Sequence, residues 1–297
     1  MSHAMVAATD GTLLQTWSNQ GAGLPLVISN GLGTPPGAWP TIAKPDSGFR
    51  VVTWYQRGLG GSERPRDEAA IRVEDHADDL GVVMDNAGME RALLLGWSVG
   101  VNVAFEFAAR HPERVAGILG VAGVPGGSLR AMYGSVGLPA PLREPVGALS
   151  AYLLRHAGPL VSSLAGLIPL SHHPLSPSGL GVMVREAQHA DSVLAVLRAF
   201  AAHDWPWYSR LVLAAGKHAP MDVSKVRCPV TLLAGRHDSI TASEDIVAVA
   251  KAMPDARVRV LAAGTHFLPL QYPDEMLAEL GALARRSDLW PGAAATA

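Results

Sequence analysis

The pentapeptide Gly-Trp-Ser-Val-Gly at residues 96–100 lies directly between an apolar run and a stretch with the pattern of a helix. Ala92–Leu95 is typical of a buried strand, and Val101–Phe105 is typical of a helix start. A G-x-S-x-G pattern in this context is typical of a nucleophile elbow, whose tight turn exposes the serine hydroxyl at a strand end. Ser98 is therefore predicted as a nucleophile. The alternative, from the pentapeptide alone, is an ordinary glycine-rich turn.

Short apolar runs and amphipathic helical stretches alternate along most of the chain. The runs predict strands, the first two joined by a turn at Asp10-Gly11, at Met5–Ala8, Thr12–Trp17, Leu24–Ser29, Phe49–Tyr55, Ala92–Trp97, Val115–Val124, Val230–Ala234 and Arg257–Ala262. Helices are expected at Val73–Met84, after Ser98, at Glu244–Met253 and at Pro273–Arg285. This alternation predicts an α/β fold with a mostly parallel sheet, covered by helices on both faces. A site on such a sheet lies at the carboxyl ends of the strands.

Residues 126–221 interrupt the alternation with helical stretches that Pro and Gly punctuate. From Ala157 to Val184 there is no Lys, Arg, Asp or Glu. We expect residues 126–221 to form a helical cap, or lid, between two parts of one core, residues 1–125 and 222–290. Its apolar residues fit a substrate wall and a subdomain that packs on itself equally well. The last segment, residues 291–297, is expected to be a disordered tail.

Charge and cysteine content argue against a nucleic-acid-binding protein, an intrachain disulfide and a metal site. The net charge is −2 with both signs interspersed, which disfavours a nucleic-acid partner. Cys228 is the single cysteine, so no intrachain disulfide forms, and no Cys/His cluster has metal-site spacing. The N-terminal residues lack the pattern of a secretory signal. The apolar stretch Ala148–Leu170 contains Arg155 and Pro159, which argue against a membrane span. A cytoplasmic protein with no transmembrane segment and no metal is expected.

Two polar residues follow predicted strands that should end at the same sheet edge as Ser98. Asp238 follows the strand Val230–Ala234, and His266 follows the strand Arg257–Ala262. A serine nucleophile needs a base, and that base needs a third group to orient it. Alone, a loop Asp or a single His is more often structural. The order Ser98, Asp238, His266 in strand-end loops instead predicts a catalytic triad with His266 as the base.

Two backbone N–H groups are expected to hold the oxyanion of an acyl-transfer reaction. One belongs to Val99, the residue after the nucleophile. The other is assigned to Leu32, in the loop after Leu24–Ser29, because Gly31 lets the backbone turn inward. The glycines of this loop do not fit G-x-G-x-x-G, and the Gly58–Gly61 turn lacks the Lys of a phosphate loop. No cofactor is therefore expected.

These motifs together resemble the α/β-hydrolase superfamily over nearly the whole predicted core. The resemblance rests on Asn30–Gly33, Gln56–Ser62, the pentapeptide around Ser98, Gly235–Asp238 and Gly264–His266. The Arg57–Ser62 turn is similar to a structural turn after the fourth strand of that family. Asn30 stands where many members carry His, and with Trp39 it is similar to the start of 3-oxoadipate enol-lactonases.

Residues and resemblance together imply a serine hydrolase that cleaves carboxylic esters of small or apolar acyl groups through an acyl-enzyme on Ser98. Its partner is expected to be an apolar small-molecule ester. Enol-lactone or lactone hydrolases, cofactor-free haloperoxidases (perhydrolases) and C–C bond hydrolases keep a similar triad and stay open. Ser98 disfavours haloalkane dehalogenases and epoxide hydrolases of this fold, which use Asp there. A non-catalytic, ligand-binding member of the fold is the alternative of another class.

Overall fold

Eight strands form one sheet in the computed structural model, which describes residues 2–167, 196 and 198–290. The strands are β1 (Ser2–Ala7), β2 (Leu13–Ser18), β3 (Leu24–Ser29), β4 (Phe49–Trp54), β5 (Ala92–Trp97), β6 (Val115–Val121), β7 (Val230–Gly235) and β8 (Ala256–Leu261). Their order across the sheet is β1-β2-β4-β3-β5-β6-β7-β8. The β1–β2 and β2–β4 pairs are antiparallel, and the pairs from β4 to β8 are parallel. The predicted mostly parallel sheet is confirmed.

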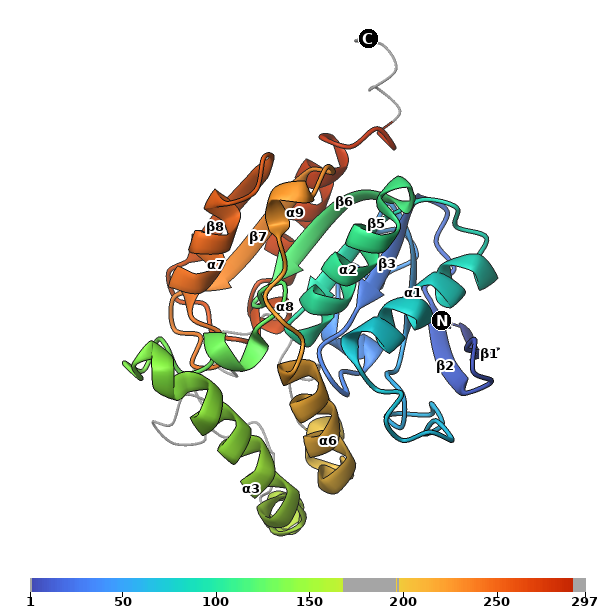
Figure 1. The fold of residues 1–297 in the computed structure, drawn as a ribbon. Helices are drawn as coiled ribbons and strands as arrows, with labels where there is room; N and C mark the ends of the chain where they lie inside the picture. The colour runs from blue at the N-terminus through green and yellow to red at the C-terminus, as the bar shows by residue number, and fades with distance from the viewer. Residues whose placement is uncertain (1, 168–195, 197, 291–297) are drawn as a thin grey trace.

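Helices cover both faces of the sheet, as predicted (Figure 1). The described helices are α1 (Val73–Asn86), α2 (Val99–Arg110), α3 (Ala140–Leu167), α6 (Trp205–Gly216), α7 (Ser243–Lys251), α8 (Leu268–Gln271) and α9 (Pro273–Ala284). Short 3-10 turns lie at Pro36–Ala38, Pro112–Arg114, Ser128–Ala131 and Val223–Lys225. The first apolar core packs α1, α2 and α7 on one face, through Leu80, Phe105 and Ile246. The second packs α9 on the other face, through Met276 and Leu280.

Strand β6 ends earlier than the apolar pattern of Val115–Val124 predicts. Ala122 takes a positive φ of 49°, and its N–H donates to Leu233 O at 2.8 Å. The chain then passes so close to the elbow that a Cβ on Gly123 would lie 2.4 Å from Ser98 O. An apolar run does not distinguish a buried strand from the buried turn that follows it. The predicted strand therefore extends past the end of β6.

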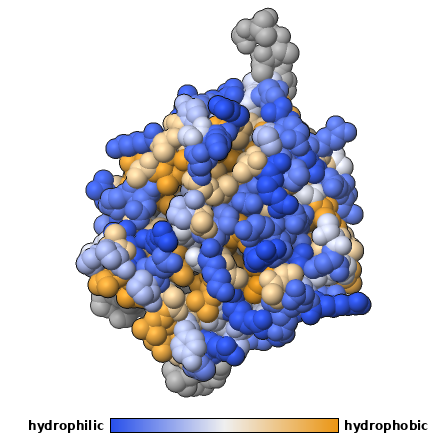
Figure 2. Space-filling view, in the orientation of Figure 1, coloured by the Kyte–Doolittle hydropathy of each residue, from blue (hydrophilic) through white to orange (hydrophobic). Residues whose placement is uncertain are grey.

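Between β6 and β7 the chain leaves the sheet, and residues 126–221, predicted as a cap, are called the insertion below. Its helices α3 and α6 pack together beyond the strand ends (Figure 1). Figure 2 shows hydrophobic residues over this part of the molecule, and the exposed ones on α3 include Leu149, Tyr152 and Leu153. Most of the uncharged segment 157–184 and the tail 291–297 lie outside the described residues. Among the described helices, none combines the length and the apolar character that a membrane crossing requires.

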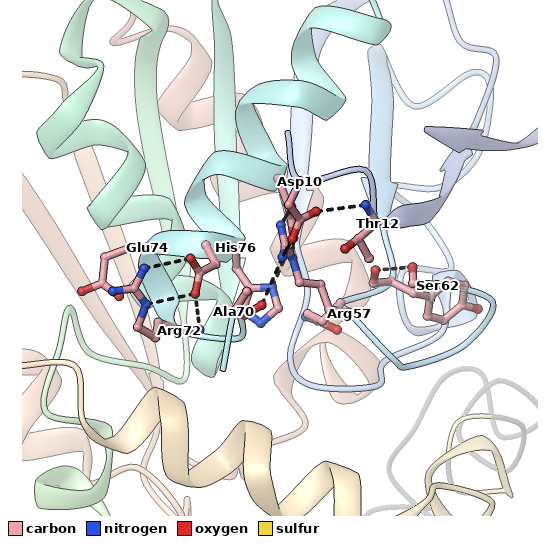
Figure 3. Close-up of polar contacts among 12 residues, drawn as sticks. Asp10, Thr12, Arg57, Ser62, Ala70, Arg72, Glu74 and His76 are labelled. Carbon is pink, nitrogen blue, oxygen red and sulfur yellow. Dashed lines mark hydrogen bonds and ion pairs between the residues drawn. The ribbon is translucent and has the colours of Figure 1, made fainter. Parts of the chain in front are cut away.

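A buried ion cluster holds the turn after β4 against α1. Arg57 Nε and Nη2 donate to the two carboxylate oxygens of Asp79 at 2.9 and 2.7 Å, and Nη1 donates to Asp10 at 2.5 Å. Figure 3 draws Arg57 together with Asp10, Ala70 and His76. Burial alone would lower the pKa of Arg57, but the hydrogen bonds and charges of Asp79 and Asp10 raise it above its ordinary value. This cluster belongs to the scaffold, since none of these residues lines the cavity that contains Ser98.

Candidate active site

Ser98 occupies a strained turn between β5 and α2. Its φ is 56° and its ψ −123°, a conformation that non-glycine residues rarely adopt. The Ser98 N–H donates to Val121 O at 2.9 Å, which ties the turn to the end of β6. A Cβ on Gly100 would lie only 1.8 Å from Ser29 O, so glycine is required where α2 passes β3. The elbow geometry expected from the pentapeptide is present.

The structure brings the side chains of Ser98, His266 and Asp238 into one hydrogen-bonded chain. His266 Nε2 lies 2.9 Å from Ser98 Oγ, and His266 Nδ1 lies 2.9 Å from Asp238 Oδ2. Asp238 is fully buried and His266 is 6% exposed, whereas Ser98 is half-buried and open to a cavity. A histidine between a carboxylate and a hydroxyl can accept the hydroxyl proton while the carboxylate supports the resulting imidazolium.

Short loops orient both partners of Ser98. The second carboxylate oxygen of Asp238, Oδ1, accepts the N–H groups of Ile240 and Thr241, each at 2.8 Å. Oδ2 is thereby directed to His266. Trp97, next to Ser98, donates its indole N–H to His266 O at 2.9 Å. The strand-end positions inferred from the sequence thus meet at one edge of the sheet.

The loop of residues 30–34 brings the N–H of Leu32 to the same cavity as Val99. Within the described ranges, neither of these two N–H groups donates to a protein acceptor. The next N–H, that of Gly33, donates to Gln56 Oε1 at 3.3 Å, which leaves Leu32 as the available donor of this loop. The turn begins at Gly31, whose carbonyl oxygen accepts the Thr34 N–H at 3.1 Å, and its left-handed residue is Gly33, with a φ of 68°. A Cβ on Gly31 would lie 3.2 Å from Thr34 Oγ1, a tight contact.

A cavity of about 380 Å³ opens over Ser98 and His266. Core residues line its floor, among them Leu32, Val99 and Phe267. The insertion supplies much of the remaining wall, including Leu129, Met132, Leu154, Phe200, Tyr208 and Val212. None of the described lining residues is Lys, Arg, Asp or Glu. The described lining of the cavity is therefore uncharged and mostly apolar.

Two contributors to the site were missed by the sequence analysis. Gln56, 3% exposed, holds the 30–34 loop by donating to Asn30 O at 2.7 Å. His203, from the insertion, packs its ring against Gly33. Neither carries a motif by itself, although Gln56 begins the Gln56–Ser62 run.

Cys228 lies outside the cavity, and burial raises the pKa of its thiol to about 11, so it is a poor nucleophile.

Among the residues that the structure describes, no group of three or more His, Cys, Asp or Glu side chains is arranged to hold a metal ion.

Comparison with known proteins places the chain in a family. The family model for the alpha/beta hydrolase fold matches residues 25–273, which includes the elbow and both partner loops. The chain belongs to the α/β-hydrolase family.

Solved members have the same architecture. An esterase from Exiguobacterium antarcticum covers 96% of this chain and 100% of its own length, with a TM-score of 0.73 at 15% identity. An enol-lactonase from Burkholderia xenovorans covers 95% and 100%, with a TM-score of 0.71 at 24% identity.

Relatives found by sequence name several hydrolases. Epoxide hydrolase B from Mycobacterium tuberculosis is 39% identical over 113 residues, which span 38% of this α/β hydrolase and only 30% of that relative. A putative carbamate hydrolase, RutD, from Azorhizobium caulinodans is 26% identical over 86% of this chain and 88% of its own length. The relatives therefore agree on hydrolase chemistry in general and differ in the bond that is cleaved.

Proposed function

We propose that this α/β hydrolase is a serine esterase that cleaves carboxylic esters of small or apolar acyl groups. The observation that carries the proposal is the hydrogen-bonded chain of Ser98, His266 and Asp238 at the floor of an apolar cavity. His266 takes the proton of Ser98 as the hydroxyl attacks the ester carbonyl, and Asp238 supports the imidazolium. The N–H groups of Leu32 and Val99 stabilise the oxyanion of the tetrahedral intermediate.

Collapse of that intermediate expels the alcohol, which takes its proton from His266, and leaves the acyl group on Ser98. Water then attacks the acyl-enzyme with His266 as the base, and the acid is released. The insertion acts as the lid of this site, because it supplies the apolar wall opposite Ser98. Its exposed apolar residues on α3 continue that character onto the surface.

Other bonds can be cleaved by the same three side chains, so the leaving group defines the alternatives. A lactone or enol-lactone is favoured by Asn30, whose Oδ1 accepts the indole N–H of Trp39 at 2.7 Å, the pair that carries the likeness to enol-lactonases. Perhydrolase and C–C bond chemistry stay open on the same grounds. A carbamate joins them through the relative RutD. Opening of an epoxide by an enzyme carboxylate is disfavoured, because a serine occupies the elbow.

A chain-length series tests the apolar cavity. The nitrophenyl ester of octanoate is expected to show a kcat/KM at least about tenfold higher than that of acetate, since each buried methylene contributes about 0.8 kcal/mol. Initial rates at matched enzyme concentrations, run beside an enol-lactone, a carbamate and an amide, identify the preferred bond. A strong preference for acetate would contradict an apolar acyl pocket. Failure of a fluorophosphonate to label the folded protein would instead favour a non-catalytic ligand-binding role.

A further inference from the structure

His203 connects the insertion to the loop that carries Leu32. Its ring lies so close to Gly33 that a Cβ there would be 2.1 Å from Nε2 and 2.3 Å from Cε1. Gly33 directly follows Leu32 and takes a φ of 68°. Any shift of the ring therefore moves the peptide between Leu32 and Gly33 or opens a gap beside it. This contact lies one residue from a proposed oxyanion donor.

The 30–34 loop is held from its other side by Gln56. Gln56 Nε2 donates to Asn30 O at 2.7 Å, and its Oε1 accepts the Gly33 N–H at 3.3 Å. Asn30 is fixed in turn, because its Nδ2 donates to Thr53 Oγ1 at 2.8 Å. These bonds come from the core, while His203 closes the side that faces the insertion. The loop is thus confined between a hydrogen-bonding residue and a packed ring.

Two aromatic rings hold the His203 ring in place. Its ring stacks on that of Tyr208, with centroids 5.3 Å apart and an interplanar angle of 17°, and Phe200 meets it edge-on at 5.4 Å. Tyr208 and Phe200 both line the cavity. A group bound there therefore lies against the two rings that support His203. The cavity wall and the 30–34 loop are in mechanical contact through this histidine.

Helix α6, which carries Tyr208, is anchored to the core beside this contact. Trp207 donates its indole N–H to Arg57 O at 2.9 Å, and the guanidinium carbons of Arg64 and Arg210 lie 4.6 and 5.1 Å from its ring centroid. The same two arginines form ion pairs with Asp204 and Glu68, respectively. The start of α6 is therefore fixed to the turn after β4, and His203 is held just before it.

The His203 ring is partly buried beside the Gly33 backbone. Its Nε2 is buried without a hydrogen-bond partner among the described residues, an arrangement that costs free energy. Burial lowers the pKa of the imidazole, and the Gly33 backbone opposes that shift without reversing it. The neutral ring therefore lies directly against the Gly33 backbone.

We propose that His203 is a positioning residue, which sets the Leu32 N–H for the oxyanion by holding Gly33 in place from the insertion. The proposal rests on the ester hydrolysis proposed above and adds a residue to it. It assigns the insertion a second role besides forming the cavity wall. In this proposal the docked position of α6, through His203, completes the oxyanion site.

Steady-state kinetics of His203→Ala on nitrophenyl octanoate test the proposal. We expect kcat to fall by about 10- to 100-fold, because small misplacements at a reacting centre are costly, with KM changed by less than about threefold. The rate of fluorophosphonate labelling of Ser98 should fall in parallel. His111→Gln is the matched control, because His111 also packs on an aromatic ring, Phe107 at 4.9 Å, at the opposite end of α2 from Ser98. If His203→Ala does not fold, His203→Gln is measured against the same criterion.

A double variant separates direct positioning from a general structural effect. Gly33→Ala should lose activity, because its methyl group meets the ring and Ala is strained at this φ. In Gly33→Ala/His203→Ala the space is free, and kcat should recover at least about fivefold over Gly33→Ala. Losses that multiply, or a His203→Ala kcat within threefold of wild type, overturn the proposal. An unlabelled, inactive wild type would instead contradict the ester hydrolysis itself.

Discussion

Replacement of Ser98 by alanine is expected to lower kcat/KM for nitrophenyl esters by at least about 1,000-fold, because no other group can form the acyl-enzyme. The residual rate would come from binding and from the oxyanion donors alone. Fluorophosphonate labelling should disappear in the same variant. Both readouts are made on purified protein, with hydrolysis followed by the release of nitrophenolate.

The fold of Ser98→Ala should be unchanged, because alanine can adopt the backbone conformation of Ser98 as readily as serine does. The hydrogen bond between Ser98 Oγ and His266 is the single described side-chain bond of Ser98. Circular dichroism and the thermal midpoint check this. Ser224→Ala is the matched control, because Ser224 is exposed and bonds to Asp222. Residual activity of Ser98→Ala within tenfold of wild type would contradict the assignment of Ser98 as the nucleophile.

The strands and the three triad candidates could be predicted because their signals are local. Apolar runs and amphipathic stretches give the order of strands and helices, and parallel strands end at a common edge. Asp238 and His266 follow their strands within a few residues, so knowing where β7 and β8 end is enough to place them beside Ser98. The hydrogen bonds among these side chains then follow from the topology.

Contacts between the insertion and the core could not be predicted in this way. His203 lies more than 160 residues from Gly33 in the sequence, and no periodic pattern links the two. Its place depends on how α6 docks, which Trp207 and the ion pairs of Arg64 and Arg210 determine. The left-handed conformation of Gly33 could not be assigned either, since two nearby glycines are equivalent until the packing around each is known.

Arg57 shows how a family motif acts on stability at a distance from the chemistry. Its side chain is 2% exposed and that of Asp79 is 0% exposed, so each neutralises the other in a site that water does not reach. The second acid, Asp10, is 36% exposed and can be solvated without Arg57. The Arg57 carbonyl oxygen also accepts a hydrogen bond from the Trp207 indole N–H. A substitution of the Arg57 side chain leaves this backbone contact in place. Loss of the guanidinium thus leaves the buried Asp79 carboxylate without its charged partner, with His76 Nδ1 3.5 Å from its Oδ2.

Arg57→Met is therefore expected to lower the free energy of unfolding by about 3–5 kcal/mol, the usual cost of an unpaired buried charge. Urea unfolding followed by circular dichroism measures this loss. Arg72→Met should cost no more than about 1 kcal/mol, because the Arg72 side chain is 65% exposed where it pairs with Asp75.

The double variant Arg57→Met/Asp79→Leu distinguishes an isolated charge from lost packing. If the charge is the cause, an apolar pair of similar volume should recover at least half of the loss, because no carboxylate is left to be desolvated. The recovered protein should also keep ester hydrolysis near the wild-type rate, since the cluster does not line the cavity. A double variant as unstable as Arg57→Met would show instead that the fit of Arg57 itself, and not the charge of Asp79, stabilises the turn after β4.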